Sequence, residues 1–205
     1  MSECQQMEEQ QLEKRQSIIE AAKTCFLNYG FKRTSMADIA KKVGISRPAL
    51  YLHFENKEAI FRALSEQLHE ATLEKAEKAL QEEGKIGDRL LKAFEYRTVE
   101  LFALVCDSVH GEELIDINGK VADDIFLLAK EKFVGMLTQA LQESEENGEI
   151  ILDNLDESLD MDARQAAELL INATSGLKKA ASTAEDFRLT LGRLIKLFEK
   201  AVLVK

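Results

Sequence analysis

Four side chains between residues 47 and 57 carry hydrogen-bond donors of the kind that bind phosphate oxygens and the edges of bases: Arg47, Tyr51, His53 and Lys57. Arginine offers a planar fork of N–H donors, and the other three carry their donors at the tip of a ring or an apolar stem. The first three lie in GISRPALYLHF, residues 44–54, which also holds the only proline of the 205 residues. Such donors serve one ligand only if a local structure presents them on one side.

Two short helices joined by a tight turn are predicted to do so. The pattern Ser35-x-x-Asp38 is a capping box that opens a helix over residues 36 to about 43. Gly44 ends this helix, because glycine readily takes the left-handed conformation found just past helix ends. The turn that follows therefore begins at a defined residue.

Pro48 marks the start of the next helix. Ser46 is a good N-cap for a short helix that is expected to run to about His53 or Phe54. Pro48 falls in its first turn, where the missing N–H would have no intrahelical partner. The proline therefore fixes the helix entrance and places Arg47 at its tip. Two short helices joined by a turn that contains glycine form the helix-turn-helix pattern.

Longer helices are predicted on both sides of this pair. The first begins near Leu12, is ended by Gly30, and carries an apolar face at spacings of three and four residues. That face is formed by Ile18, Ala22, Phe26 and Tyr29. The helix after the pair begins near Asn56 and continues to about Leu80.

The distribution of charge separates this region from the rest of the chain. Residues 14–62 hold ten basic and four acidic side chains, a net charge of +6. Residues 1–13 carry −4, so the total of −10 leaves −12 for the remaining residues. A basic block joined to an acidic body is expected of a DNA-binding head on a domain that does not bind DNA.

The stretch from Ile18 to about Leu64 resembles the tetracycline-repressor (TetR/AcrR) family of bacterial transcriptional regulators. Its most specific parts are Phe26, Tyr29-Gly30-Phe31, Thr34, Asp38-Ile39-Ala40, Val43-Gly44-Ile45-Ser46 and Leu50-Tyr51-x-His53-Phe54-x-x-Lys57-Glu58. The resemblance implies an all-α fold. A three-helix head would be joined by a long helix to a helical bundle that binds an effector and forms a dimer.

The resemblance also implies which residues of the head meet DNA. Phosphate contacts are expected from Thr34, Tyr51, His53 and Lys57, contacts with base edges from Ser46, Arg47, Pro48 and Ala49, and Ser35 belongs to the same interface. Family members often carry a basic N-terminal arm, whereas residues 1–13 here are acidic. Only Lys14 and Arg15 are then available for the minor groove.

The expected domains are a DNA-binding domain over residues 11–57, with its last helix continuing to about 80, and an all-helical effector-binding and dimerisation domain over 58–205. In the second domain, Asp88 can cap a helix that reaches about Val105. Further helices are expected near 111–118, 121–146, 162–180 and 185–203, with a turn and a short extended piece over 147–151.

Most of the aromatic and soft side chains of this second domain are candidates for a ligand pocket: Phe94, Tyr96, Phe102, Cys106, His110, Phe126, Phe133 and Met136. An apolar cavity with one or two polar anchors suits a small organic effector. The alternative for each residue is an ordinary place in the core.

Two stripes of small and branched residues on the last two helices are candidates for a dimer interface: Ala166, Leu170, Ala173, Gly176 and Leu177, then Leu191, Leu194, Ile195 and Phe198. Two such hairpins related by a two-fold axis would form a four-helix bundle. Packing within one chain is the alternative. A dimer is favoured because one head offers few base contacts, whereas a two-fold dimer reads two half-sites.

Other classes of function have less support. The chain has no nucleophile elbow, no phosphate-binding glycine loop and no HExxH motif, so an enzyme is not expected. His110 lacks a second histidine at a ligand spacing, and no metal or cofactor is expected. No apolar run approaches the ~20 residues that span a bilayer. An N-terminus without an apolar signal segment, together with three widely spaced cysteines (Cys4, Cys25 and Cys106), predicts a cytoplasmic protein.

The sequence therefore predicts a homodimeric one-component transcriptional regulator. It is expected to act as a repressor that binds a palindromic operator and is released by an unknown small organic effector. The alternative is a helical small-molecule binding protein without specific DNA recognition. The complete set of Arg47, Tyr51, His53 and Lys57 within a basic block favours the regulator.

Overall fold

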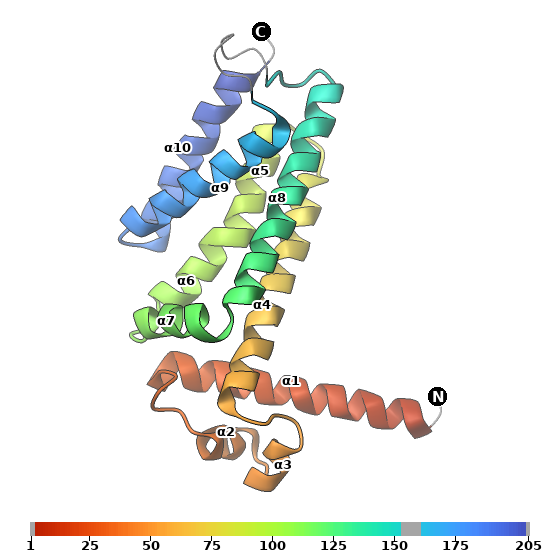
Figure 1. Cartoon of the computed structure of the whole chain (residues 1–205), viewed down its shortest axis with the longest axis vertical. Coiled ribbons are helices and arrows are strands. Elements are labelled where there is room, and N and C mark those ends of the chain that lie inside the picture. Colours follow the sequence, from red (N-terminus) through yellow and green to blue (C-terminus); the bar gives the residue numbers. More distant parts are fainter. Residues whose placement is uncertain (1–2, 153–160, 204–205) are drawn as a thin grey trace. The chain divides into compact units, whose positions relative to one another are not determined.

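The computed structural model of the chain describes residues 3–152 and 161–203, and within these residues it is helical, with a single isolated β-bridge and no strand. The all-α fold predicted from the sequence is confirmed. In chain order (Figure 1) the elements are α1 (Glu3–Tyr29), α2 (Met36–Val43), α3 (Arg47–Tyr51), α4 (Lys57–Leu80), α5 (Ile86–Phe94), the π-helical η1 (Glu95–Val99), α6 (Glu100–Cys106), α7 (Gly111–Val121), α8 (Asp123–Glu146), α9 (Ala163–Ala180) and α10 (Ala184–Val202).

The chain packs as two compact units. The head unit comprises the residues up to Leu68 together with Asp107–Phe126, and the body unit comprises His69–Cys106 together with the residues from Leu127 onward. The chain therefore changes unit inside α4, after α6 and inside α8. The boundaries between these packing units, after Leu68, Cys106 and Phe126, differ from the functional boundary predicted after residue 57.

The core of the head unit is built around a group of phenylalanines. The ring centroids of Phe26, Phe31 and Phe61 lie 5.3–5.7 Å from one another, which joins α1, the loop after it and α4. Of the predicted apolar face of α1, Ile18, Ala22 and Phe26 are buried, but Tyr29 is 58% exposed. That prediction for Tyr29 is wrong: the core is continued by Gly30 and Phe31 after the helix, while the side chain of Tyr29 lies outside it.

The first helix begins nine residues earlier than predicted, at Glu3 instead of Leu12. No apolar burial accounts for this extension, since Met7 and Leu12 are both exposed. The residues concerned are mostly Glu and Gln, which are good helix formers, and neither Gly nor Pro interrupts them. The acidic N-terminal segment is therefore helical.

Helix α7 is part of the head unit, although it lies far along the chain. Leu114 of α7 is buried in the same core as α1 and α4. The backbone N–H of Lys32 donates to the carboxylate of Glu113 at 2.6 Å. The guanidinium of Arg62 on α4 forms two hydrogen bonds of 2.7 Å with Asp124, whose pKa it lowers to about 2. Hydrogen bonds from two separate segments, the loop at Lys32 and helix α4, thus hold α7 and the start of α8 within this unit.

The body unit departs from the prediction at its first helices. Asp88 does not cap α5, because the N-cap is Lys85, which makes no side-chain cap hydrogen bond. The single helix expected to reach Val105 is interrupted by the π-helical turn η1. Beyond α8, the predicted extended piece is confirmed: Ile150 pairs with Leu203, and the N–H of Ile151 donates to the carbonyl of Val202 at 2.8 Å.

The core of the body unit joins side chains from helices that are distant in sequence. The ring centroids of Phe94 and Phe133 lie 5.1 Å apart, and those of Phe102 and Phe187 lie 5.3 Å apart. Across the described ranges, no helix is long and apolar enough to cross a membrane.

We predict that Gly30→Ala destabilises the head unit by about 1–3 kcal/mol. Gly30 has φ +81°, and a Cβ added there would lie 2.5 Å from Oε2 of Glu113, which must then move from its place beside Lys32. Urea-induced unfolding measures the change. Gly119→Ala is the matched control, because a Cβ at this helical position of α7 has open space and should stabilise the protein by about 0.5–1 kcal/mol. Equal effects of the two substitutions would contradict the strain assigned to a side chain at Gly30.

Candidate nucleic-acid interface

Local hydrogen bonds fix the ends of α2 and α3 as the sequence predicts. Ser35 and Asp38 form the reciprocal capping box, and the hydrogen bonds from Ser35 lower the pKa of the Asp38 carboxyl. Gly44 follows α2 in the left-handed conformation with φ 77°. Ser46 caps α3 by accepting a hydrogen bond of 3.2 Å from the N–H of Ala49, and Pro48 occupies the first turn. The α2–turn–α3 arrangement is therefore a helix-turn-helix.

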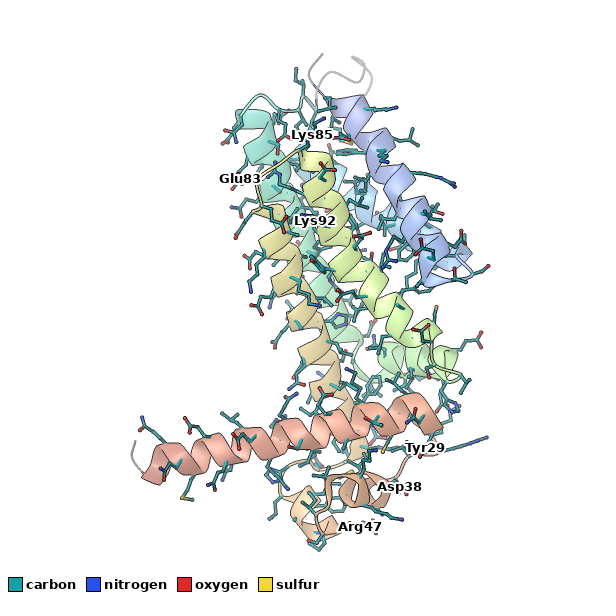
Figure 2. All side chains as sticks on the ribbon, turned by 180° about the vertical axis from the view of Figure 1, so that it is seen from behind. Tyr29, Asp38, Arg47, Glu83, Lys85 and Lys92 are labelled. Atoms are coloured by element: carbon teal, nitrogen blue, oxygen red, sulfur yellow. The ribbon has the colours of Figure 1, made fainter. Side chains whose placement is uncertain are left out.

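The two faces of α3 differ in burial. Leu50 and Phe54 are buried in the head core, whereas Tyr51 is 43% and Leu52 86% exposed. Figure 2 shows Arg47 at the outer edge of the head unit, on the side of α2 and α3 that faces away from α1. The helix itself ends at Tyr51, two to three residues earlier than predicted. Its exposed face is short and ends in open solvent.

Arg47 and Tyr51 lie one helical turn apart and contact each other. Nη2 of Arg47 donates to the hydroxyl of Tyr51 at 3.3 Å, and the guanidinium carbon lies 5.6 Å from the centre of the tyrosine ring. Two of the predicted DNA-binding donors are therefore brought together. Exposed cations of the same unit, Lys32, Arg33, Lys41 and Lys42, add to its positive charge.

Two other predicted phosphate ligands serve the fold of the head. Thr34 is buried, and its hydroxyl donates to the carbonyl of Gly30 at 2.7 Å. Nζ of Lys57 donates to the carbonyls of Phe31 at 2.8 Å and Thr34 at 3.1 Å. These bonds close the loop between α1 and α2 against the start of α4. The prediction that the Thr34 side chain binds phosphate is not supported by this geometry.

The remaining predicted residues lie around α3. Ser35, Ser46 and Pro48 are exposed, and Ala49 and His53 are half-buried. Arg15, which the sequence offered for the minor groove, packs on the head instead. Its Nη1 donates to the carbonyl of His53 at 3.2 Å, and its guanidinium carbon lies 4.1 Å from the centre of the Phe54 ring.

The predicted pocket residues are divided between the two units. Phe94, Phe102 and Phe133 are buried in the body unit, and Tyr96 and Met136 pack against the same core. Cys106 is exposed at the end of α6. His110 and Phe126 belong to the head unit and the other six to the body unit, so a single pocket lined by all eight stays a prediction. Sequence periodicity does not reveal this change of unit after α6.

Sequence reasoning missed the buried cations of the body unit. Arg97 is only 6% exposed, and Lys178 of α9 is half-buried. One signal was available: Arg97 follows Phe94 by three residues, at a position of the helix where the apolar pattern calls for an apolar side chain.

The predicted dimer residues divide into two groups. Ala166, Leu170, Leu191 and Ile195 are enclosed in the core of their own chain, which contradicts a place for them at an interface. Ala173, Leu177, Leu194 and Phe198 are half-buried, and Gly176 is exposed. Large apolar side chains that the stripes did not include are exposed on the same hairpin: Leu169, Leu189 and Leu197. Within the described residues, a face of α9 and α10 thus remains exposed.

Comparison with known proteins agrees with the helix-turn-helix described above. Residues 18–64 match the family described as bacterial regulatory proteins, tetR family. Over 62 residues the chain is 47% identical to the HTH-type transcriptional regulator TtgR of Pseudomonas putida, a match that covers 30% of this chain and 30% of TtgR. The matched segment thus spans less than a third of that curated relative.

Similarity of structure extends over nearly the whole chain. A transcriptional regulator from Cytophaga hutchinsonii is similar with a TM-score of 0.76 and 22% identity, covering 91% of this chain and 97% of that one. SmeT, the repressor of the Stenotrophomonas maltophilia multidrug efflux pump SmeDEF, is similar with a TM-score of 0.66 and 19% identity, covering 93% and 91%. At these identities the similarity shows the fold. Residues 18–64 are therefore assigned to the tetR family of bacterial regulatory proteins, and the rest of the chain shares the fold of such regulators.

We predict that Lys57→Met lowers the free energy of unfolding by about 1–3 kcal/mol, because it leaves the carbonyls of Phe31 and Thr34 without their charged donor. Lys41→Met, at an exposed position of α2, should change it by less than about 0.5 kcal/mol. Chemical denaturation measures both. If Lys57 serves only as a phosphate ligand, the two variants will be equally stable.

Proposed function

We propose that the protein is a homodimeric one-component transcriptional repressor that binds a palindromic operator and is released by a small organic effector. The observation that carries the proposal is the exposed face of α3. Arg47, Pro48 and Tyr51 are exposed on a helix whose opposite side is anchored by buried Leu50 and Phe54. A recognition helix needs this division, because it enters the major groove while remaining fixed to its domain.

The exposed side chains suit different parts of a duplex. Arg47 stands at the N-terminal tip of α3, where a bidentate contact with a guanine edge is sterically open. Ser46, Pro48 and Ala49 are small enough to let the helix approach base edges closely. Tyr51 and His53 lie at the margin of this face and are assigned to phosphates, as is Ser35 at the start of α2. Lys57, whose Nζ donates to backbone carbonyls, is assigned to the frame that positions them.

The dimer is assigned to the uncovered face of α9 and α10, which Figure 1 shows side by side. Leu169, Leu189 and Leu197 are more than half exposed there, and Gly176 and Ala173 allow a close approach between helices. A two-fold axis through this face would pair two hairpins into a four-helix bundle. Two heads would then read half-sites ~34–36 Å apart, or multiples of this distance.

Two continuous helices are assigned to the coupling between effector and operator. The sequence pointed to α4, and α8 also runs without a break from one unit into the other. The ends of α4 and α8 that lie in the head unit are held together by the Arg62–Asp124 ion pair. A small change in the body would thus be passed to the head at two points, and a coupling of ~1–3 kcal/mol is enough for a 5–150-fold change in affinity.

The solved complex of SmeT with triclosan supports a ligand for a protein of this fold. That complex concerns SmeT, and the effector of the present chain is assigned below from its own residues.

We predict that Arg47→Ala weakens binding to the preferred sequence by ~1–3 kcal/mol and removes discrimination at one base position in each half-site. Fluorescence anisotropy with the preferred duplex and its single-base variants, at one stated salt concentration, measures both effects. Arg33→Ala, at an exposed position before α2, is the control that should keep the sequence preference. Unchanged affinity and preference in Arg47→Ala would contradict the role of Arg47.

We predict that Tyr51→Phe weakens binding to all sequences about equally, by about 1 kcal/mol, because the hydroxyl is assigned to a phosphate. Since this hydroxyl also accepts a hydrogen bond from Arg47, the double variant should lose less than the two single variants together. The same anisotropy titrations form the double-mutant cycle. A loss confined to one base position in Tyr51→Phe would show that the two roles are exchanged.

A further inference from the structure

Arg97, in the middle of η1, is a buried cation without a counter-charge. Its side chain is 6% exposed, its Nε has no hydrogen-bond partner, and within the described part of the chain it forms no ion pair. The carboxylates nearest to it in sequence are engaged elsewhere: Glu95 pairs with Arg188 at 3.4 Å and Glu100 with Lys75 at 2.7 Å. A buried charge left in this state is costly, so it calls for a partner.

Arg89 shows how the same body unit treats a buried arginine that serves the fold. Its guanidinium pairs with Glu149 at 3.0 Å and donates to the hydroxyl of Ser144 at 2.9 Å and to the carbonyl of Leu80 at 3.1 Å. Arg89 is thus compensated by the chain itself. Arg97 is more deeply buried and lacks any such set of acceptors.

Lys178 and His69, from two other helices, interact electrostatically with Arg97. Burial and the charge of Arg97 lower the pKa of Lys178 on α9, and burial with the charges of Arg97 and Lys178 lowers the pKa of His69 on α4 to about 4. These side chains therefore lie within electrostatic reach of one another. Thr174, one turn before Lys178, is buried, and its hydroxyl has no hydrogen-bond partner.

The backbone gives an independent sign of a site at this place. Arg97 lies in a π-helical turn, and such turns inside α-helices are frequent at functional sites. Apolar rings adjoin the cations: Nζ of Lys178 lies 5.7 Å from the centre of the Phe102 ring, which contacts Phe187. The surroundings therefore combine two positive charges with aromatic surface.

We propose that the body unit binds a small organic anion, a carboxylate on an apolar molecule, with Arg97 and Lys178 as its counter-charges and the hydroxyl of Thr174 as a further donor. The carboxylate supplies the acceptors that Arg97 lacks, and the apolar part contacts Phe102 and its neighbours. The inference rests on the proposed function in one respect: the anion is assigned as the effector.

The test uses thermal unfolding of the full chain without DNA. The probes are benzoate and hexanoate at millimolar concentration, each beside its neutral primary amide. The carboxylates should raise the Tm of the wild type by about 2–4 °C and the amides should not. Lys178→Gln and Thr174→Val should reduce this rise, while Lys179→Gln, at the exposed neighbouring position, should keep it.

Arg97→Met distinguishes a ligand site from a structural role. Because it removes an uncompensated buried charge, it should raise the Tm of the ligand-free protein and abolish the response to carboxylates. Arg89→Met, which breaks a compensated pair, should lower the Tm. The proposal is overturned if Arg97→Met lowers the Tm as Arg89→Met does, or if the carboxylates stabilise the wild type no more than they stabilise Arg97→Met.

A separate titration with the preferred duplex keeps the two proposals apart. A carboxylate that raises the Tm but leaves DNA bound supports the anion site and contradicts its role as effector. Failure of the ligand-free protein to prefer any sequence contradicts the repressor, while an Arg97-dependent rise in Tm still supports the anion site.

Discussion

A helix of five residues has too few internal hydrogen bonds to be stable alone, and α3 therefore depends on the packing of Leu50 and Phe54 into the head core. The DNA contacts assigned to α3 all depend on the burial of Leu50 and Phe54. The cap at Ser46 and the ring of Pro48 set where α3 begins, but only the core decides which side faces outward. Arg47 and Tyr51 are exposed because Leu50 and Phe54 are not.

The two units treat their internal charges differently. In the head unit, Lys57 is held by backbone carbonyls and Arg62 by Asp124, so that buried or half-buried cations stabilise the frame around α3. In the body unit, Arg89 follows the same rule and Arg97 does not. The frame that holds a recognition helix must stay fixed, whereas a site for a ligand must leave some acceptors to be supplied by that ligand. The contrast is consistent with a rigid reader and a responsive body.

The sequence was sufficient for features that depend on neighbours three or four residues away. The capping box at Ser35, the turn at Gly44 and the proline in the first turn of α3 are all of this kind, and the structure confirms them. Features that depend on distant packing were missed or wrong. Periodicity placed Tyr29 in the core, and it placed His110 and Phe126 with the body unit, because it cannot show where a helix leaves one core for another. Four of the nine predicted dimer residues proved to lie in the interior of their own chain for the same reason. Arg97 was missed because a single cation on an apolar helix face interrupts that pattern at one position and forms no repeating pattern that would mark a site.

The central claim is that the exposed face of α3, presented twice by a two-fold dimer, reads a specific DNA sequence. The most direct measurement is the selection of bound sites from random duplex DNA by the purified full-length protein at a stated salt concentration. The expected result is a palindrome whose half-sites are centred about one helical turn apart, or a multiple of it. Binding that is sensitive to salt but blind to sequence, or no binding at all, would contradict it and would favour a helical small-molecule binding protein without specific DNA recognition.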